Sequence, residues 1–230
     1  MFLFFSEQII NDQLILTDDE HKHCAKVLRK NEGDTIYVTD GKGNIHTAVI
    51  NHIKKNETYC KIAQTDSKVP LPRSITIAIS PTKNASRIEW FVEKAVEIGI
   101  TCIVLFQAHR TEKKSFNTKR LEKIMISAMK QSLNVHLPQL HYFENADNMI
   151  KSFENIDQKY IAYCDGPIQN LNVISNSDSD VVVLIGPEGD FTPKEIEKAQ
   201  NAGFIPVSLG ESRLRTETAG VVALMMLRLQ

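Results

Sequence analysis

The sequence has 230 residues, of which 42% are hydrophobic and 24% charged, and it contains 27 Lys and Arg against 28 Asp and Glu. These values are close to globular averages and exclude a disordered, collagenous or low-complexity chain, which would have fewer apolar residues, a lopsided charge or far more Gly and Pro. A chain of this length fits one large domain or a small domain beside a medium one.

Residues 1–70 predict a small β-barrel domain. A short helix is expected from Thr17 to about Lys30, because acidic residues fill its first turn. Strands are expected at 35–39, 45–53 and 58–63, with a tight turn at 40–44 between the first two. The prolines of 69–72 then predict a stiff connection, so the domains are expected at 1–70 and 73–230.

From Arg73 onward, predicted strands and helices alternate along the chain. This alternation predicts a mostly parallel sheet with helices on both faces, and therefore an α/β fold class for the larger domain. The expected strands are 74–80, 101–107, 160–164, 181–185 and 205–209, and the expected helices are 85–98, 117–133, 193–202 and a last one from Thr216.

The apolar segments are too short for a membrane span or an export signal. The longest run, 221–227, ends at Arg228 and falls short of the roughly 20 residues that cross a bilayer. Residues 1–5 lack the basic start and long apolar stretch of a secretory signal. The cysteines form no C-x-x-C pair and are expected to be reduced, as in a cytoplasmic protein; they are Cys24, Cys60, Cys102 and Cys164.

The segment 110–130 is strongly basic, with seven Lys or Arg against two Glu. Such a segment would attract a phosphate-rich partner, although a solvated helix face explains the same pattern equally well. A close histidine pair, His21 and His23, is interpreted as the surface start of a helix rather than a metal site.

The run from Val181 to Glu195 is the most informative part of the sequence. A buried strand leads into the turn Gly186-Pro187-Glu188-Gly189, and Thr192 with Glu195 predicts a capping box at the next helix. In an open α/β sheet, ligands bind at turns that follow the carboxyl ends of strands, and glycines allow close backbone approach. A tight structural turn is the alternative. Phosphate loops of the G-x-x-x-x-G-K-[ST] and G-x-G-x-x-G types, nucleophile elbows and H-E-x-x-H are absent.

A second informative run extends from Val207 to Gly220. It combines a strand end, Gly210, the arginines Arg213 and Arg215, and the threonine-rich start of an apolar helix. Charges at the start of such a helix are costly unless they contact a ligand, a partner or each other.

Together these runs resemble the RsmE family of ribosomal RNA methyltransferases, and the resemblance extends over nearly the whole chain. Further matching segments lie at 23–29, 33–34, 40–43, 81–83, 92–99, 130–132 and 137–138. The chain departs from the family pattern at Thr111-Glu112-Lys113 and at Asn134, where many members have arginine in the basic segment.

The resemblance implies a SPOUT-class domain, with a trefoil-knotted and mostly parallel sheet, behind a small PUA-like β-barrel. It also implies S-adenosyl-L-methionine as cofactor and 16S ribosomal RNA, within the small subunit, as partner. The implied reaction is methylation of N3 of a uridine, expected at uracil 1498 near the decoding region. The alternative is a non-catalytic, dimeric RNA-binding protein of ribosome assembly.

Site residues follow from the same resemblance. Arg215 is expected near the reacting groups, and Glu217 is expected to be a general base or to orient Arg215. The cofactor is expected at three loops and at one preceding strand end, through Cys164, Leu184, Ile185, Gly186, Pro187, Glu188, Gly189, Ser208, Leu209, Gly210, Leu214, Arg215, Thr216 and Ala219. RNA contacts are expected from Arg29, Arg110, Lys113, Lys114, Lys119 and Arg120. No metal is expected, because a sulfonium already supplies an electrophilic methyl group.

A homodimer is also expected. The last helix carries apolar residues on too many sides for one sheet to cover, which indicates a partner on its other face. These residues are Val221, Val222, Leu224, Met225, Met226 and Leu227.

Overall fold

The computed structural model describes residues 2–112, 116–163 and 168–230. The chain forms two compact units. The first contains Met1–Pro70 and Ile126–Leu137, and the second contains Leu71–Met125 and Pro138–Gln230. Cys164, Lys113 and Lys114 lie outside the described residues.

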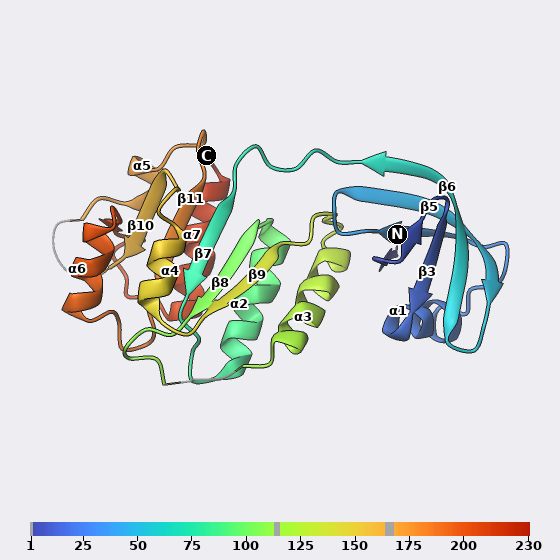
Figure 1. The fold of residues 1–230 in the computed structure, drawn as a ribbon, viewed down its shortest axis with the longest axis horizontal. Helices are drawn as coiled ribbons and strands as arrows, with labels where there is room; N and C mark the ends of the chain where they lie inside the picture. The colour runs from blue at the N-terminus through green and yellow to red at the C-terminus, as the bar shows by residue number, and fades with distance from the viewer. Residues whose placement is uncertain (1, 113–115, 164–167) are drawn as a thin grey trace. The chain divides into compact units, whose positions relative to one another are not determined.

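The first unit is built on a six-stranded sheet with the order β1-β4-β5-β6-β3-β2. Figure 1 labels β3, β5 and β6 of this sheet. The edge strand β1 pairs in parallel with β4, and all other neighbours are antiparallel. The strands are β1 (Leu3–Phe5), β2 (Ile9–Ile10), β3 (Gln13–Thr17), β4 (Thr35–Thr39), β5 (Asn44–Ile53) and β6 (Glu57–Ser67). The three N-terminal strands were not predicted, because only β3 shows a clear polar–apolar alternation and none has a recognisable turn before it.

A short helix follows β3, but it ends earlier than the sequence predicts. It runs as α1 (Asp18–Lys22), continues as the π-helix η1 (His23–Val27), and Arg29 then adopts a positive φ of 51°. The interpretation of His21 as a surface residue is wrong, since its side chain is buried. Its Nε2 lies 3.2 Å from the Lys55 carbonyl, which only accepts hydrogen bonds, so Nδ1 accepts from the Thr58 hydroxyl at 2.9 Å.

The segment after α3 (Thr118–Gln131) completes the first unit. Gly43 donates its N–H to the Val135 carbonyl at 2.9 Å, and the Leu137 N–H donates to Gly41 at 2.8 Å. Gly41 and Gly43 both have positive φ, and a Cβ at Gly43 would lie 2.7 Å from the His136 ring. Residues 135–137 are therefore held against the Asp40 to Gly43 turn by backbone hydrogen bonds.

The second unit is built on a six-stranded sheet in which every pairing is parallel, with the order β12-β10-β11-β7-β8-β9. Its strands are β7 (Ile75–Ile79), β8 (Cys102–Phe106), β9 (Gln139–Phe143), β10 (Gln158–Ala162), β11 (Val181–Ile185) and β12 (Ile205–Val207). The residues of β7 and β11 are buried throughout, as expected for strands covered on both faces.

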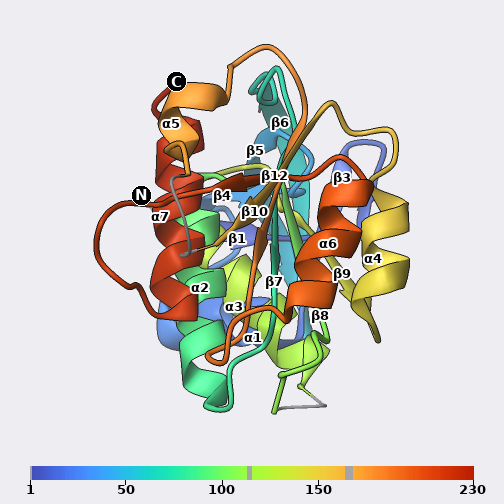
Figure 2. The same ribbon diagram turned by 90° about the vertical axis from the view of Figure 1, so that its left-hand side faces the viewer.

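Helices cover both faces of this sheet (Figure 2). α2 (Ala85–Ile98) and α7 (Thr216–Arg228) lie on one face, and α4 (Ala146–Ser152) and α6 (Pro193–Asn201) lie on the other. A one-turn helix, α5 (Leu171–Ile174), packs against α7. The predicted α/β class is confirmed. β9, α4 and α5 were not predicted, since β9 and α4 are short and largely polar and α5 is a single turn of four residues.

Three glutamates four residues apart on α2, Glu89, Glu93 and Glu97, are paired with cations. Glu89 accepts two hydrogen bonds from Arg120, and Lys94 bonds to both Glu93 and Glu97. Among the described residues, no helix is long and apolar enough to cross a membrane.

A tight helix–helix contact in the second unit joins α2 and α7 at Gly220. A Cβ at Gly220 would lie 2.5 Å from Phe91 Cε2 and 3.1 Å from Ile79 Cδ1. Phe91 is fully buried between the helices and the sheet. Only glycine at position 220 permits this approach, which fixes α7 against α2 and β7.

We expect Gly220→Ala to destabilise the protein by about 1–3 kcal/mol, because the added methyl group overpacks against Phe91 and Ile79. An uncrowded glycine inside a helix would respond in the opposite sense, with a gain of about 0.5–1 kcal/mol. Urea denaturation measures the difference. Gly220→Ala combined with Phe91→Leu should lose less stability than the two single changes added together, and a stabilised Gly220→Ala variant would contradict the tight contact.

Candidate active site

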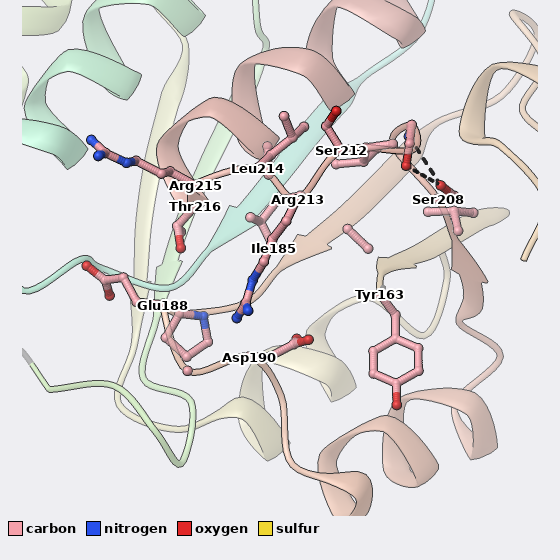
Figure 3. A pocket seen from close by; sticks show the side chains of 18 of the residues that line it. Tyr163, Ile185, Glu188, Asp190, Ser208, Ser212, Arg213, Leu214, Arg215 and Thr216 are labelled. Carbon is pink, nitrogen blue, oxygen red and sulfur yellow. Dashed lines mark hydrogen bonds between the residues drawn. The ribbon is translucent and has the colours of Figure 1, made fainter. Parts of the chain in front are cut away.

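A cavity of about 920 Å³ opens at the carboxyl edge of the parallel sheet, within the second unit. Its walls come from the segments that follow β10, β11 and β12 and from the start of α7 (Figure 3). Because parallel strands end at the same edge of a sheet, three turns that are distant in sequence meet there.

The first wall is the turn 186–190 that follows β11. A Cβ on Gly186 would lie 3.1 Å from two atoms of the Phe191 ring, so glycine is needed for the chain to pass over that ring. Phe191 is buried and stacks on Phe106, with ring centroids 6.2 Å apart. Asp190 adopts a φ of 59° and accepts the Phe191 N–H on its own carboxylate at 2.7 Å. The turn is therefore held by the core beneath it.

Two polar contacts hold the same turn from outside. Arg110 Nη1 donates to the Gly189 carbonyl at 2.6 Å. Glu195 completes the predicted capping box with Thr192 and also accepts the His109 N–H at 2.8 Å. The 109–110 segment is thus attached both to the turn and to the start of α6.

The second wall is the segment 208–210 that follows β12. The Ser208 N–H donates to Gln169 at 2.9 Å and the Ser208 carbonyl accepts from Leu171 at 3.0 Å, so the segment runs beside the chain that leads into α5. The Ser208 hydroxyl bonds to both backbone groups of Gly210 (Figure 3). Gly210 has a φ of 128° and open space on its Cβ side, so no side chain of its own covers the segment there.

The third wall carries two exposed arginines, Arg213 and Arg215. Arg213 extends into the cavity toward Asp190 and the 187–190 turn, whereas Arg215 points in the opposite direction (Figure 3). Within the part of the chain that the structure describes, neither guanidinium has an ion-pair partner. The cavity therefore presents free cationic groups beside exposed backbone amides and carbonyls.

Most of the cofactor residues expected from the sequence meet in this cavity. Twelve of them line it: Ile185, Gly186, Pro187, Glu188, Gly189, Ser208, Leu209, Gly210, Leu214, Arg215, Thr216 and Ala219. Leu184 does not line the cavity, because strand alternation turns its side chain into the core on the α4 and α6 face. Cys164 lies outside the described residues.

Glu217 does not line the cavity either. Its side chain is buried, and its Oε1 lies 3.8 Å from Arg87 Nε on α2. Glu217 was expected to be a general base or to orient Arg215, but helix periodicity turns position 217 toward Arg87 on α2 rather than toward the cavity.

Nine of the described residues that line the cavity were not predicted as cofactor residues, although Arg110 among them was predicted to contact RNA: Arg110, Ala162, Tyr163, Ile168, Asp190, Val207, Glu211, Ser212 and Arg213. Most flank the predicted loops, so widening each loop by one or two residues would have found them. Arg110 follows β8 and reaches the cavity through the fold alone, since its sequence neighbours are part of a basic segment.

The expected RNA-binding residues fall into two groups. Arg29 and Lys119 are exposed, and the described structure gives neither an ion pair. Arg110 bonds to Gly189, and Arg120 forms two hydrogen bonds with Glu89 at 2.5 and 2.8 Å. Within the described residues, no group of three His, Cys, Asp or Glu side chains could hold a metal ion.

The family models that match this chain place the fold and its cavity among RNA methyltransferases. Residues 69–228 match the family model described as an RNA methyltransferase domain, and residues 16–63 match the model described as an RNA methyltransferase PUA domain. The methyltransferase-domain match alone covers more than half of the chain, and the PUA-domain match precedes it in the sequence.

The chain belongs to the RsmE family of ribosomal RNA small subunit methyltransferases. It is 27% identical to ribosomal RNA small subunit methyltransferase E of Bacillus subtilis, over 91% of this chain and 87% of that protein. The resemblance stated from sequence motifs is confirmed.

Two solved structures support the same membership. A probable rRNA methyltransferase from Porphyromonas gingivalis is 40% identical, with a TM-score of 0.89 over 100% of this chain and 99% of that one. Ribosomal RNA small subunit methyltransferase E from Neisseria gonorrhoeae, solved bound to S-adenosyl methionine, is 28% identical, with a TM-score of 0.88 over 100% of this chain and 97% of that one.

Proposed function

We propose that the protein transfers a methyl group from S-adenosyl-L-methionine to N3 of a uridine in small-subunit ribosomal RNA, expected at uracil 1498. The observation that carries this proposal is the cavity at the carboxyl edge of the sheet, where three loops present backbone groups beside unpaired arginines. Membership of the RsmE family and the relative bound to S-adenosyl methionine support the choice of cofactor and RNA.

The lining residues fit this cofactor. A cavity of about 920 Å³ is within the roughly 300–1,000 Å³ range of small-molecule sites. Ile185, Leu209 and Leu214 supply apolar surface for the adenine ring, and the lining glycines Gly186, Gly189 and Gly210 allow the cofactor close approach to the backbone. When bound, S-adenosyl-L-methionine supplies an electrophilic methyl group on its sulfonium.

The protein's own groups must accept the N3 proton or release it to water, and stabilise the charge that develops on the base. Uracil N3 carries a proton that must leave, and negative charge then develops on the neighbouring carbonyl oxygens. Arg213 extends into the cavity and is placed to stabilise that charge, while Arg215 lies at the other side of the same wall (Figure 3). The proton leaves to water or to a lining carboxylate such as Asp190. Glu217, which faces Arg87, is assigned no proton transfer.

RNA contacts are proposed for exposed cations on each unit. Arg29 in the first unit and Lys119 in the second are available for phosphate groups. Arg110 retains further N–H donors beyond its bond to Gly189, whereas Arg120 would have to exchange Glu89 for a phosphate. RNA contacts by Lys113 and Lys114 are proposed from the sequence alone, because both lie outside the described residues.

A non-catalytic RNA-binding protein is the alternative function. It accounts for the exposed cations and for the PUA domain match. It gives no role to the open backbone at Gly210 or to an arginine directed into the cavity. Binding of cofactor separates the two functions.

We expect the free protein to bind S-adenosylhomocysteine without RNA, because the cavity lies within one unit. Gly210→Ala should weaken binding about tenfold, since an alanine at a φ of 128° is strained by about 1–3 kcal/mol and would shift the 208–210 wall. Calorimetric titration measures the affinity. The thermal midpoint should fall as well, because the same strain destabilises the folded chain. Gly33→Ala, at a φ of 89° with open space in the first unit, is the matched control, and it should lower the thermal midpoint without changing the affinity. Absence of binding to the unmodified protein would favour the non-catalytic alternative.

We expect ribosomal RNA from a strain lacking this gene to lose one methyl group from a small-subunit uridine. The unmodified gene should restore the methyl group, while Arg213→Gln should not, because its neutral amide stabilises developing charge far less than a guanidinium does. Mass mapping of the RNA measures the result. A methyl group at another base, or full restoration by Arg213→Gln, would contradict the assignment.

Arg29→Ala should reduce the affinity for small subunits and the salt dependence of that affinity, without altering the affinity for S-adenosylhomocysteine.

The protein is further proposed to act as a homodimer through the outer side of α7. Met225 and Leu229 lie four residues apart on one side of the helix, and Val173 of the adjoining α5 is 72% exposed. Gln230 donates to the Asn172 carbonyl, which places these apolar groups close together. An exposed cluster of this kind is typical of an interface.

Met225→Asp should convert the dimer to a monomer, because it puts a charge into an apolar interface. Sedimentation or light scattering measures the mass, and Ile205→Asp, at an exposed apolar position on β12, is the matched control. A monomeric unmodified protein would exclude this part of the proposal.

A further inference from the structure

Arg87 occupies a position that helix electrostatics disfavour. It is the third residue of α2, which starts after the N-cap Asn84 and has no acidic residue in its first turn. The N-terminus of a helix carries partial positive charge, so a cation in the first turn is repelled. Arg87 must therefore be compensated by groups outside its own helix.

Two glutamates from the walls of the cavity supply that compensation. Arg87 Nη1 lies 3.8 Å from Glu188 Oε1, and Arg87 Nε lies 3.8 Å from Glu217 Oε1. Glu188 belongs to the turn after β11, and Glu217 follows the cavity residue Thr216 in α7. One guanidinium thus joins two of the three walls.

Of the two ion pairs of Arg87, the one with Glu217 involves the more buried carboxylate. Glu217 is 7% exposed, and within the described residues its Oε2 has no hydrogen-bond partner. A buried carboxylate is costly unless a cation lies beside it, and Arg87 is the cation that the described structure places there. Glu188, at the cavity rim, additionally accepts the Lys83 N–H at 3.2 Å.

The helix contact that brings Arg87 and Glu217 together is the same one that buries Phe91 against Gly220. Arg87 lies four residues before Phe91, and Glu217 lies three residues before Gly220, so both sit one turn nearer the cavity on the facing sides of their helices. The ion pair is therefore set by a rigid packing contact.

We propose that Arg87 is a positioning residue, which holds the 186–190 turn and the start of α7 at the separation that cofactor binding requires. It does not line the cavity and acts through Glu188 and Glu217. This inference rests on the proposed function, since it assigns Arg87 to the S-adenosyl-L-methionine site.

The test compares Arg87→Gln, Arg87→Lys, Glu217→Gln and the double variant Arg87→Gln with Glu217→Gln. Arg87→Gln should raise the Kd for S-adenosylhomocysteine and the KM for S-adenosyl-L-methionine about tenfold, with a smaller change in kcat, because the cavity walls separate while Arg213 remains. Arg87→Lys should recover part of the affinity by restoring the charge. The double variant should lose less affinity than the two single changes added together, since the neutral amide that replaces the carboxylate of Glu217 no longer needs a cation.

Lys94→Gln is the matched control, because Lys94 is a cation of the same helix that bonds to Glu93 and Glu97, away from the cavity. Its Kd should equal that of the unmodified protein. An unchanged Kd in Arg87→Gln, a lowered thermal midpoint with unchanged Kd, or a fully additive double variant would each overturn the positioning role.

Hydrogen exchange without cofactor separates this inference from the proposed function. Arg87→Gln should speed exchange of the amides at 186–190 and 216–219, and Lys94→Gln should not. If the unmodified protein fails to bind S-adenosylhomocysteine, the proposed function is wrong. If the protein binds it and Arg87→Gln exchanges and binds like the unmodified protein, the positioning role alone is wrong.

Discussion

The missing side chain at Gly220 sets the spacing between α7 and α2, and the rest of the second unit follows from that spacing. Phe91 fills the space directly over Gly220, so neither helix has freedom to slide along the other. One turn closer to the helix starts, the same contact brings Arg87 to Glu217. The packing of Phe91 against Gly220 thereby determines the position of residues 213–219, which form the third wall of the cavity.

The cavity itself is built largely from backbone held by distant groups. Gly186 passes over the buried Phe191 ring, Arg110 bonds to Gly189, and Ser208 bonds to Gly210. Each wall is thus fixed by an interaction that lies beneath or beside it. Preorganised backbone groups suit the recognition of a small molecule with many hydrogen-bonding atoms, because they lose little entropy when it binds.

The arginines of the second unit divide according to their partners. Arg87 and Arg120 are neutralised by glutamates, and Arg110 is bonded to the Gly189 carbonyl. Arg213 and Arg215 have no ion pair within the described residues, and both line the cavity. The cavity therefore offers a substrate two arginines without an ion pair among the described residues, although the net charge of the whole chain is only −1.

The sequence by itself determined the α/β class, most strands and helices of the second unit, and the glycine turn after β11, while the resemblance to the RsmE family supplied the full set of three cofactor loops. These features depend on local signals: the apolar run of β11, the capping box of α6, and glycines at turns. It did not find β9, α4 or the N-terminal strands, because short polar or edge segments carry no clear period. Only the tertiary structure decided which way individual side chains face. Leu184 turns into the core, Glu217 turns to Arg87, and Arg110 reaches Gly189, since those directions depend on which elements pack together rather than on neighbours in sequence.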